Sequence, residues 1–264
     1  MGQTIACTNQ KGGVGKTTTV VNLATYLALA GDRVLVVDLD PQGNATSGFG
    51  VDRASLDGSV YDALVGDRSL GTLHVATSVD GVRIVPSAIA LAGAEVELAG
   101  EPARERRLAR AVAQERDAWD WVLVDCPPSL GLLTVNALTG VDAVLVPIQC
   151  EYYALEGLTQ LIATINLVRD HLNPDLEIAG VLLTMFDART NLSAEVADEV
   201  RRHLGDTVFR AIVPRSVRLS EAPSHGLPIA LYRPESKGAE AYQALAAELR
   251  ARRGPAATLA GAVA

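Results

Sequence analysis

The sequence is poor in cysteine and in aromatic residues: its 264 residues include three cysteines, and aromatic side chains make up 4%. Three cysteines cannot all pair and none belongs to a C-x-x-C motif, which favours a reducing, cytoplasmic setting. No apolar run reaches the ~18 residues of a transmembrane helix, and the start of the chain lacks a signal-peptide pattern. We therefore expect a cytoplasmic protein with no membrane partner.

Basic charge is also scarce, since 23 Lys and Arg face 31 Asp and Glu, for a net charge of −8. On charge alone, nucleic acid would be a poor candidate as partner. The hydrophobic content is 48%, which suits one large domain better than two small ones. We expect a single domain over residues 1–253, followed by a flexible tail of small residues over 254–264.

Short apolar strands alternate with helical segments along most of the chain. The expected strands are 4–8, 34–37, 82–85, 121–125, 143–146, 178–183 and 208–213. The expected helices are 18–30, 103–118, 155–171, 192–204 and 235–253. Strands that are apolar almost throughout indicate a sheet buried on both faces. The sequence therefore predicts an α/β fold, with a mostly parallel twisted sheet and helices on both faces.

Residues 10 to 18 read Gln-Lys-Gly-Gly-Val-Gly-Lys-Thr-Thr and lie between an expected strand and an expected helix. Such a unit directs backbone N–H groups and the positive end of a helix at one point, where a polyphosphate is held. Gly12, Gly13 and Gly15 let the backbone wrap closely. Lys16 takes the lysine position of a phosphate-binding loop, and Thr17 takes the hydroxyl position that serves Mg²⁺.

Two residues depart from the ordinary loop pattern G-x-x-x-x-G-K-[ST]. Gln10 stands where that pattern has glycine, and Lys11 adds a lysine that has no role in an ordinary phosphate loop. The loop is therefore of a deviant type. The plainer alternative for Lys11 is a solvated loop lysine.

Three aspartates follow two of the expected strands. Hydrolysis of a nucleoside triphosphate needs a phosphate cradle, Mg²⁺, a positioned water and positive charge. Because ligands of open α/β sheets bind beyond the carboxyl ends of strands, we expect Asp125 and Asp38 to support the magnesium site and Asp40 to orient the attacking water. The alternative is that these aspartates only form surface turns or caps.

These motifs resemble those of the ParA/Soj chromosome- and plasmid-partition ATPases, a family with a deviant Walker A loop. The resemblance spans about residues 3 to 250 and is carried by residues 11–19, 37–46, 124–129, 149–157 and 212–223. It implies a P-loop NTPase fold, ATP and Mg²⁺ as cofactors, and slow ATP hydrolysis. It also implies a homodimer in the ATP-bound state, non-specific DNA binding at the nucleoid, and stimulation by a ParB-type centromere-binding protein.

The resemblance assigns roles to single residues as well. Lys11 contacts phosphates bound by the other subunit, so that positive charge arrives with the partner, as with an arginine finger. Together with Lys16 and Asp40 it makes up the expected catalytic set, and the expected metal contacts are Thr17, Asp38 and Asp125. The expected cofactor contacts are Lys11, Gly12, Gly13, Val14, Gly15, Lys16, Thr17, Thr18, Met185, Pro214 and Ser216. The last three of these flank the nucleobase, and Phe186 beside them fits the core equally well.

A local excess of arginine answers the charge objection. Residues 189–218 hold six arginines and four acidic residues, a sum of +2. Dimerisation would double the number of phosphate contacts. By resemblance to Soj-type members, Arg189 and Arg218 are the first DNA-binding candidates. Arg201 and Arg202 fit either a DNA contact or a solvated helix face.

Two other functions stay open as alternatives. A MinD-like membrane-cycling ATPase would need a basic amphipathic helix at the C-terminus, and residues 254–264 contain no Lys, Phe or Trp. An iron–sulfur ATPase of the nitrogenase-reductase type needs exposed cysteines. Cys7 and Cys150 fall in or beside expected buried strands, and Cys126 stands alone.

Overall fold

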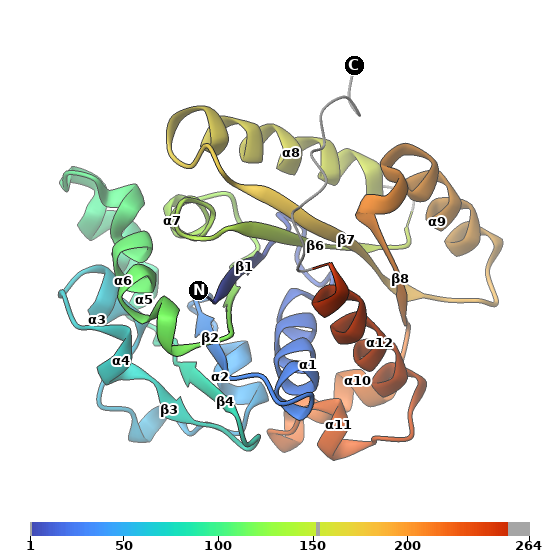
Figure 1. The fold of residues 1–264 in the computed structure, drawn as a ribbon, viewed down its shortest axis with the longest axis horizontal. Helices are drawn as coiled ribbons and strands as arrows, with labels where there is room; N and C mark the ends of the chain where they lie inside the picture. The colour runs from blue at the N-terminus through green and yellow to red at the C-terminus, as the bar shows by residue number, and fades with distance from the viewer. Residues whose placement is uncertain (1, 152–153, 253–264) are drawn as a thin grey trace.

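One eight-stranded sheet organises the computed structural model, which describes residues 2–151 and 154–252 (Figure 1). The strand order is β3-β4-β2-β5-β1-β6-β7-β8, and every neighbouring pair is parallel except β3 with β4. This arrangement confirms the predicted fold class. The strands are β1 (Gln3–Cys7), β2 (Val34–Asp38), β3 (Val75–Ala76), β4 (Val82–Val85), β5 (Trp121–Asp125), β6 (Ala143–Gln149), β7 (Glu177–Phe186) and β8 (Val208–Pro214).

Helices cover both faces of the sheet (Figure 1). One face carries α1, α2, α10, α11 and α12, and the other carries α3 to α9. The helices are α1 (Lys16–Leu29), α2 (Asn44–Gly48), α3 (Val60–Leu64), α4 (Leu70–Leu73), α5 (Leu91–Glu97), α6 (Arg107–Glu115), α7 (Leu132–Gly140), α8 (Ala154–His171), α9 (Asn191–Leu204), α10 (Val217–Glu221), α11 (Ile229–Tyr232) and α12 (Lys237–Ala251). Among the described residues, no helix has both the length and the apolar character needed to cross a membrane.

The strands divide their side chains between two apolar cores. Successive residues of a strand point to opposite faces of the sheet. In β2, Val34 and Val36 therefore pack with α1 and α12, whereas Leu35 and Val37 pack in the core on the other face. Both faces are buried, which is why these strands read as unbroken apolar runs.

Several element boundaries differ from the sequence prediction. The helix predicted over 103–118 is found in shorter form, because α6 covers Arg107–Glu115 and 3-10 turns flank it at Arg104–Arg106 and Arg116–Ala118. Ala103, with φ 51°, lies outside it. The helix predicted from 18 begins at Lys16, directly after left-handed Gly15. The helix predicted from 235 begins at Lys237, where the Ser236 side chain accepts a hydrogen bond from Ala239 N–H. The predicted tail over 254–264 lies outside the described residues.

Candidate nucleotide site

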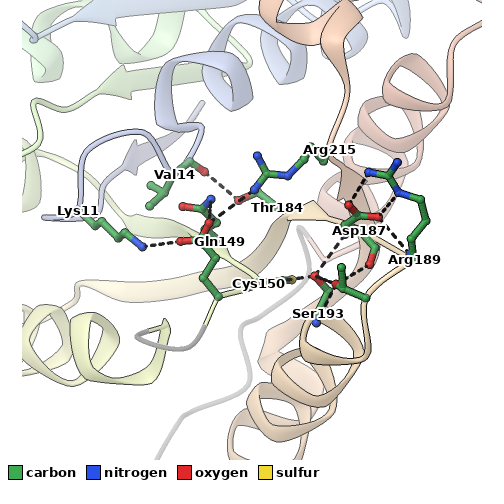
Figure 2. Close-up of polar contacts among 11 residues, drawn as sticks. Lys11, Val14, Gln149, Cys150, Thr184, Asp187, Arg189, Ser193 and Arg215 are labelled. Atoms are coloured by element: carbon green, nitrogen blue, oxygen red, sulfur yellow. Dashed lines mark hydrogen bonds and ion pairs between the residues drawn. The ribbon is translucent and has the colours of Figure 1, made fainter.

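The predicted phosphate loop connects β1 to α1 at the carboxyl edge of the sheet. Gly13 and Gly15 have φ of 76° and 89°, values that glycine adopts without steric cost. Because Gly15 has no side chain to cap α1, the first N–H groups of that helix are left for an anion. Thr184 Oγ1 on β7 donates to the Val14 carbonyl at 2.9 Å and anchors the loop (Figure 2).

Lys16 brings a buried positive charge into this loop. The residue is 6% exposed, and its Nζ donates to the Lys11 carbonyl oxygen at 3.2 Å. Lys16 forms no salt bridge with any of the described residues. A buried charge without a counter-ion is costly, and a bound phosphate would provide that counter-ion.

Two carboxylates lie side by side beneath the loop. Asp38 and Asp125 are register partners at the ends of β2 and β5, and both are 0% exposed. Asp38 Oδ2 accepts hydrogen bonds from Thr46 N–H at 2.8 Å and Thr46 Oγ1 at 2.6 Å. Neither Asp125 oxygen has a hydrogen-bond partner in the described part of the chain.

Both carboxyl groups resist ionisation in this environment. Burial first, and the charge of Asp38 second, raise the pKa of Asp125 well above its usual value. A polar contact with the Thr17 hydroxyl and the charge of Lys16 act in the opposite direction. Burial likewise raises the pKa of Asp38 to about 6, against the hydrogen bonds from Thr46. A nearby cation would favour the ionised forms.

The unsatisfied oxygens of Asp125, next to Thr17, fit a hard cation such as Mg²⁺. No group of three or more His, Cys, Asp or Glu side chains that could hold a metal occurs among the described residues. Mg²⁺ usually keeps several waters and takes oxygens from bound phosphates. The donor set therefore fits magnesium that arrives with a nucleotide.

Asp40 belongs to a loop whose next two residues, Pro41 and Gln42, are held by Arg53. The residue is 6% exposed, and one carboxylate oxygen accepts Gln42 N–H at 2.9 Å. Arg53 Nη1 donates to the Gln42 carbonyl at 2.6 Å, and its Nη2 donates to the Pro41 carbonyl at 3.3 Å. Asp40 also lines the cavity described next.

A cavity of about 880 Å³ opens above these groups, within the size range of small-molecule sites. Met185 lines it with φ 50°, an uncommon backbone conformation for a residue other than glycine. Phe186 packs against the apolar core instead. The predicted site residues that line the cavity are Gly12, Gly13, Gly15, Lys16, Thr17, Thr18, Asp40, Met185, Pro214 and Ser216. Four further predicted residues, Lys11, Val14, Asp38 and Asp125, are not part of the cavity wall formed by the described part of the chain.

Lys11 extends to the end of β6, as Figure 2 shows. Its Nζ lies 3.2 Å from Glu151 Oε2, with the two side chains 42% and 45% exposed. Arg215 Nη2 lies 3.5 Å from Glu151 Oε1, which also accepts Gln149 Nε2 at 2.5 Å. Glu151 thus joins the loop to the ends of β6 and β8.

The two predicted DNA-binding arginines are exposed and follow neighbouring strands. Arg189 follows β7, is 85% exposed at its side chain, and contacts both carboxylate oxygens of Asp187 at 2.8 and 2.7 Å. Arg189 lowers the pKa of Asp187 to about 2. Arg218 on α10 is 52% exposed and pairs with Glu221 at 2.8 Å.

Several residues of this site were not assigned a role from the sequence. Thr46 and Thr184 make the contacts above. Thr46 lies in a stretch that carries the family resemblance, whereas no sequence motif marks Thr184. Glu151 lies in a stretch that carries the family resemblance, and that stretch was the available signal for it. The three cysteines are free and buried.

Comparison with known proteins places the chain in a family. Residues 2–178 match the AAA_31 model, described as an AAA domain. The chain is 57% identical over 251 residues to the sporulation initiation inhibitor protein Soj of Bacillus subtilis, across 95% of this chain and 99% of the relative. It is 53% identical over 255 residues to the chromosome partitioning protein ParA of Myxococcus xanthus, across 97% and 90%. The chain belongs to the ParA/Soj family of chromosome-partitioning ATPases.

A solved structure of the same fold carries ligands. Cobyrinic acid a,c-diamide synthase from Mycobacterium smegmatis, with a bound ATP analogue and magnesium, is 40% identical with a TM-score of 0.84. The alignment covers 96% of each chain. This identity is lower than that of the two ParA/Soj relatives, which is consistent with the family assignment.

Proposed function

We propose that this ParA/Soj ATPase binds ATP and Mg²⁺ in the cavity, and that ATP joins two copies face to face. The observation that carries the proposal is the position of Lys11. Its side chain is 42% exposed and held by Glu151, whereas Lys16 lines the cavity of its own subunit. An exposed ion pair contributes about 0–1 kcal/mol. Lys11 can therefore leave Glu151 and contact the phosphates of the nucleotide bound by a second copy, with little loss of free energy.

The remaining residues support hydrolysis in that dimer. Lys16 and the N–H groups of the loop would hold the phosphates. Thr17 would offer its hydroxyl to Mg²⁺, and Asp38 and Asp125 would support the magnesium site. Asp40 orients the attacking water. When bound, Mg²⁺ helps to neutralise the charge of the transferred phosphoryl group. Lys11 of the second copy adds positive charge, so hydrolysis depends on dimerisation.

The same dimer is proposed to bind DNA without sequence preference and so to associate with the nucleoid. Arg189 and Arg218 of both copies would contact phosphates. A local sum of +2 over residues 189–218, against −8 for the chain, supports this choice of surface. A ParB-type centromere-binding protein is proposed to stimulate the slow hydrolysis, which separates the copies and releases DNA.

Dimerisation is tested by light scattering with ATP in the Asp40→Ala background, where slowed hydrolysis should preserve the dimer. Lys11→Ala added to this background should give the monomer mass while nucleotide fluorescence still reports bound ATP. Lys237→Ala, an exposed lysine on α12, is the matched control. A dimer that persists without Lys11 would contradict the proposed contact.

A further inference from the structure

Helix α5 presents an apolar surface to solvent. Ile89, just before the helix, is 74% exposed and Val96 is 78% exposed, the two highest values for large apolar residues in the described part of the chain. They lie seven residues apart, with exposed Ala92 between them. Ala92 and Val96 lie four residues apart on one face of α5. Ile89 precedes the helix in a turn that is closed by a 3.1 Å hydrogen bond from Ala92 N–H to the Ile89 carbonyl oxygen. Leu91 and Ala94 bury the opposite face. We call Ile89, Ala92 and Val96 the α5 ridge.

The helix beneath this ridge is joined to the loop that follows Asp125. Glu95 Oε1 accepts the Leu133 N–H at 3.3 Å, in the first turn of α7. A Cβ atom at Gly131 would lie 2.4 Å from the same oxygen, so the carboxylate rests directly on the Gly131 backbone. A carboxylate at a helix N-terminus is stabilised by the helix dipole. Any displacement of α5 therefore acts on the segment between Asp125 and α7.

The chain just before the ridge is joined to the other buried carboxylate. Ser87 N–H donates to Thr46 Oγ1 at 3.1 Å, and that hydroxyl donates to Asp38 Oδ2 at 2.6 Å. Ser87 and Glu95 lie on either side of the first half of α5. The α5 segment thus contacts both loops that flank the proposed magnesium site.

Charge indicates what could cover the ridge. Val96 stands between Glu95 and Glu97, and α5 contains no basic residue. Glu97 is exposed, and its Oε2 accepts the Tyr61 hydroxyl at 2.8 Å. The proposed dimer already assigns a second copy of this chain to Lys11, so we infer a different partner for the ridge. A segment that combines apolar and basic side chains complements both features.

We propose that the α5 ridge is the docking surface of the ParB-type protein that stimulates hydrolysis, which presents a short basic amphipathic segment to it. This inference rests on the proposed function. A partner on the ridge presses on a helix that holds the loop after Asp125 through Glu95 and the Asp38 carboxylate through Ser87 and Thr46. Docking thereby reaches the hydrolytic groups without entering the cavity.

The test uses a double variant, Ile89→Ser with Val96→Ser, which removes apolar surface without disturbing the core. Its ATPase rate is measured with DNA, with and without the purified ParB-type protein from the same genome. We expect stimulation to fall about tenfold or more, because a few desolvated contacts near the centre of an interface carry most of its binding energy. The basal rate and the mass with ATP should not change. The matched control, Leu29→Ser with Leu167→Ser, alters residues of 61% and 60% exposure on α1 and α8.

Three other results would overturn the proposal, and they are distinguishable. Full stimulation of the double variant would show that the partner docks elsewhere. Loss of the ATP-dependent dimer in the double variant would show that a second copy covers the ridge. If the wild-type chain itself is not stimulated, the partner step of the proposed function fails and the docking surface fails with it.

Discussion

Thr46 fixes the position of the Asp38 carboxylate. Its N–H and its hydroxyl both donate to Asp38 Oδ2, and the hydroxyl oxygen accepts Ser87 N–H at 3.1 Å. All of these groups are buried. The Asp38 carboxylate therefore depends on a residue that would not itself touch the metal or the nucleotide.

Thr46→Val keeps the shape of the side chain but leaves Asp38 with one donor fewer and Ser87 N–H without its acceptor. A buried polar group that loses its partner costs about 1–3 kcal/mol. We expect a loss of that size in the free energy of unfolding, measured with denaturant. We also expect a weaker gain in nucleotide affinity when Mg²⁺ is added.

Thr46→Ser is the control, since it restores the hydroxyl and should recover the effect of Mg²⁺ on nucleotide affinity. If the valine variant binds nucleotide with an unchanged Mg²⁺ dependence, Thr46 has only a structural role.

The candidate residues that the sequence predicts are those that stand in a recognisable motif with their neighbours along the chain. Lys16 and Thr17 stand in a recognisable loop, and Asp125 ends an apolar strand. Thr184 could not be found in this way, because its contact with Val14 spans 170 positions. Only the fold brings such pairs together.

At the scale of elements, the strands were easier to predict than the helices. Strands buried on both faces read as unbroken apolar runs, and every expected strand has a counterpart in the sheet. Helix α7 was missed because most of its residues are buried. A helix buried on most sides has no separate polar face, so its sequence lacks the alternation of apolar and polar residues that marks a surface helix. The short helices α2 to α5 lack the length for a clear periodicity.

Helix α12 offers a test of local capping. It packs against α1 and β8, and Ser236 caps its first turn through a 3.2 Å bond from Ala239 N–H. Ser236→Ala should lower the free energy of unfolding by about 1 kcal/mol, measured by denaturant titration. Ser224→Ala, which removes a hydroxyl from an exposed 3-10 turn, is the control. Equal effects of the two changes would show that the cap contributes nothing specific.

At the scale of the whole molecule, an acidic chain is proposed to bind a polyanion through a local surface. Arg189 and Arg218 already have carboxylate partners, Asp187 and Glu221. DNA phosphates would have to compete with these internal anions. The net charge of −8 argues against nucleic acid as a partner of the chain as a whole, but it does not describe a local group of arginines.

Arg189→Glu or Arg218→Glu should weaken DNA binding by the ATP-bound dimer about tenfold or more. Each lost phosphate contact should also lower the slope of log affinity against log salt by about 0.9. The ATPase rate without DNA should not change. Arg110→Glu, an exposed arginine on α6, is the matched control for net charge. DNA affinity and salt slope that stay at wild-type values would place the DNA surface elsewhere.

The hydrogen bond from Lys16 Nζ to the Lys11 carbonyl oxygen links the side chain of one loop lysine to the backbone of the other. A phosphate that takes the Lys16 ammonium must compete with that carbonyl. In the proposed dimer, the ligand of its own subunit would thus release the Lys11 backbone, and the Lys11 side chain would leave Glu151 for the phosphates held by the other subunit. Nucleotide binding in one cavity would in this way act, through the backbone of a single loop, on the residue proposed to contact the second copy.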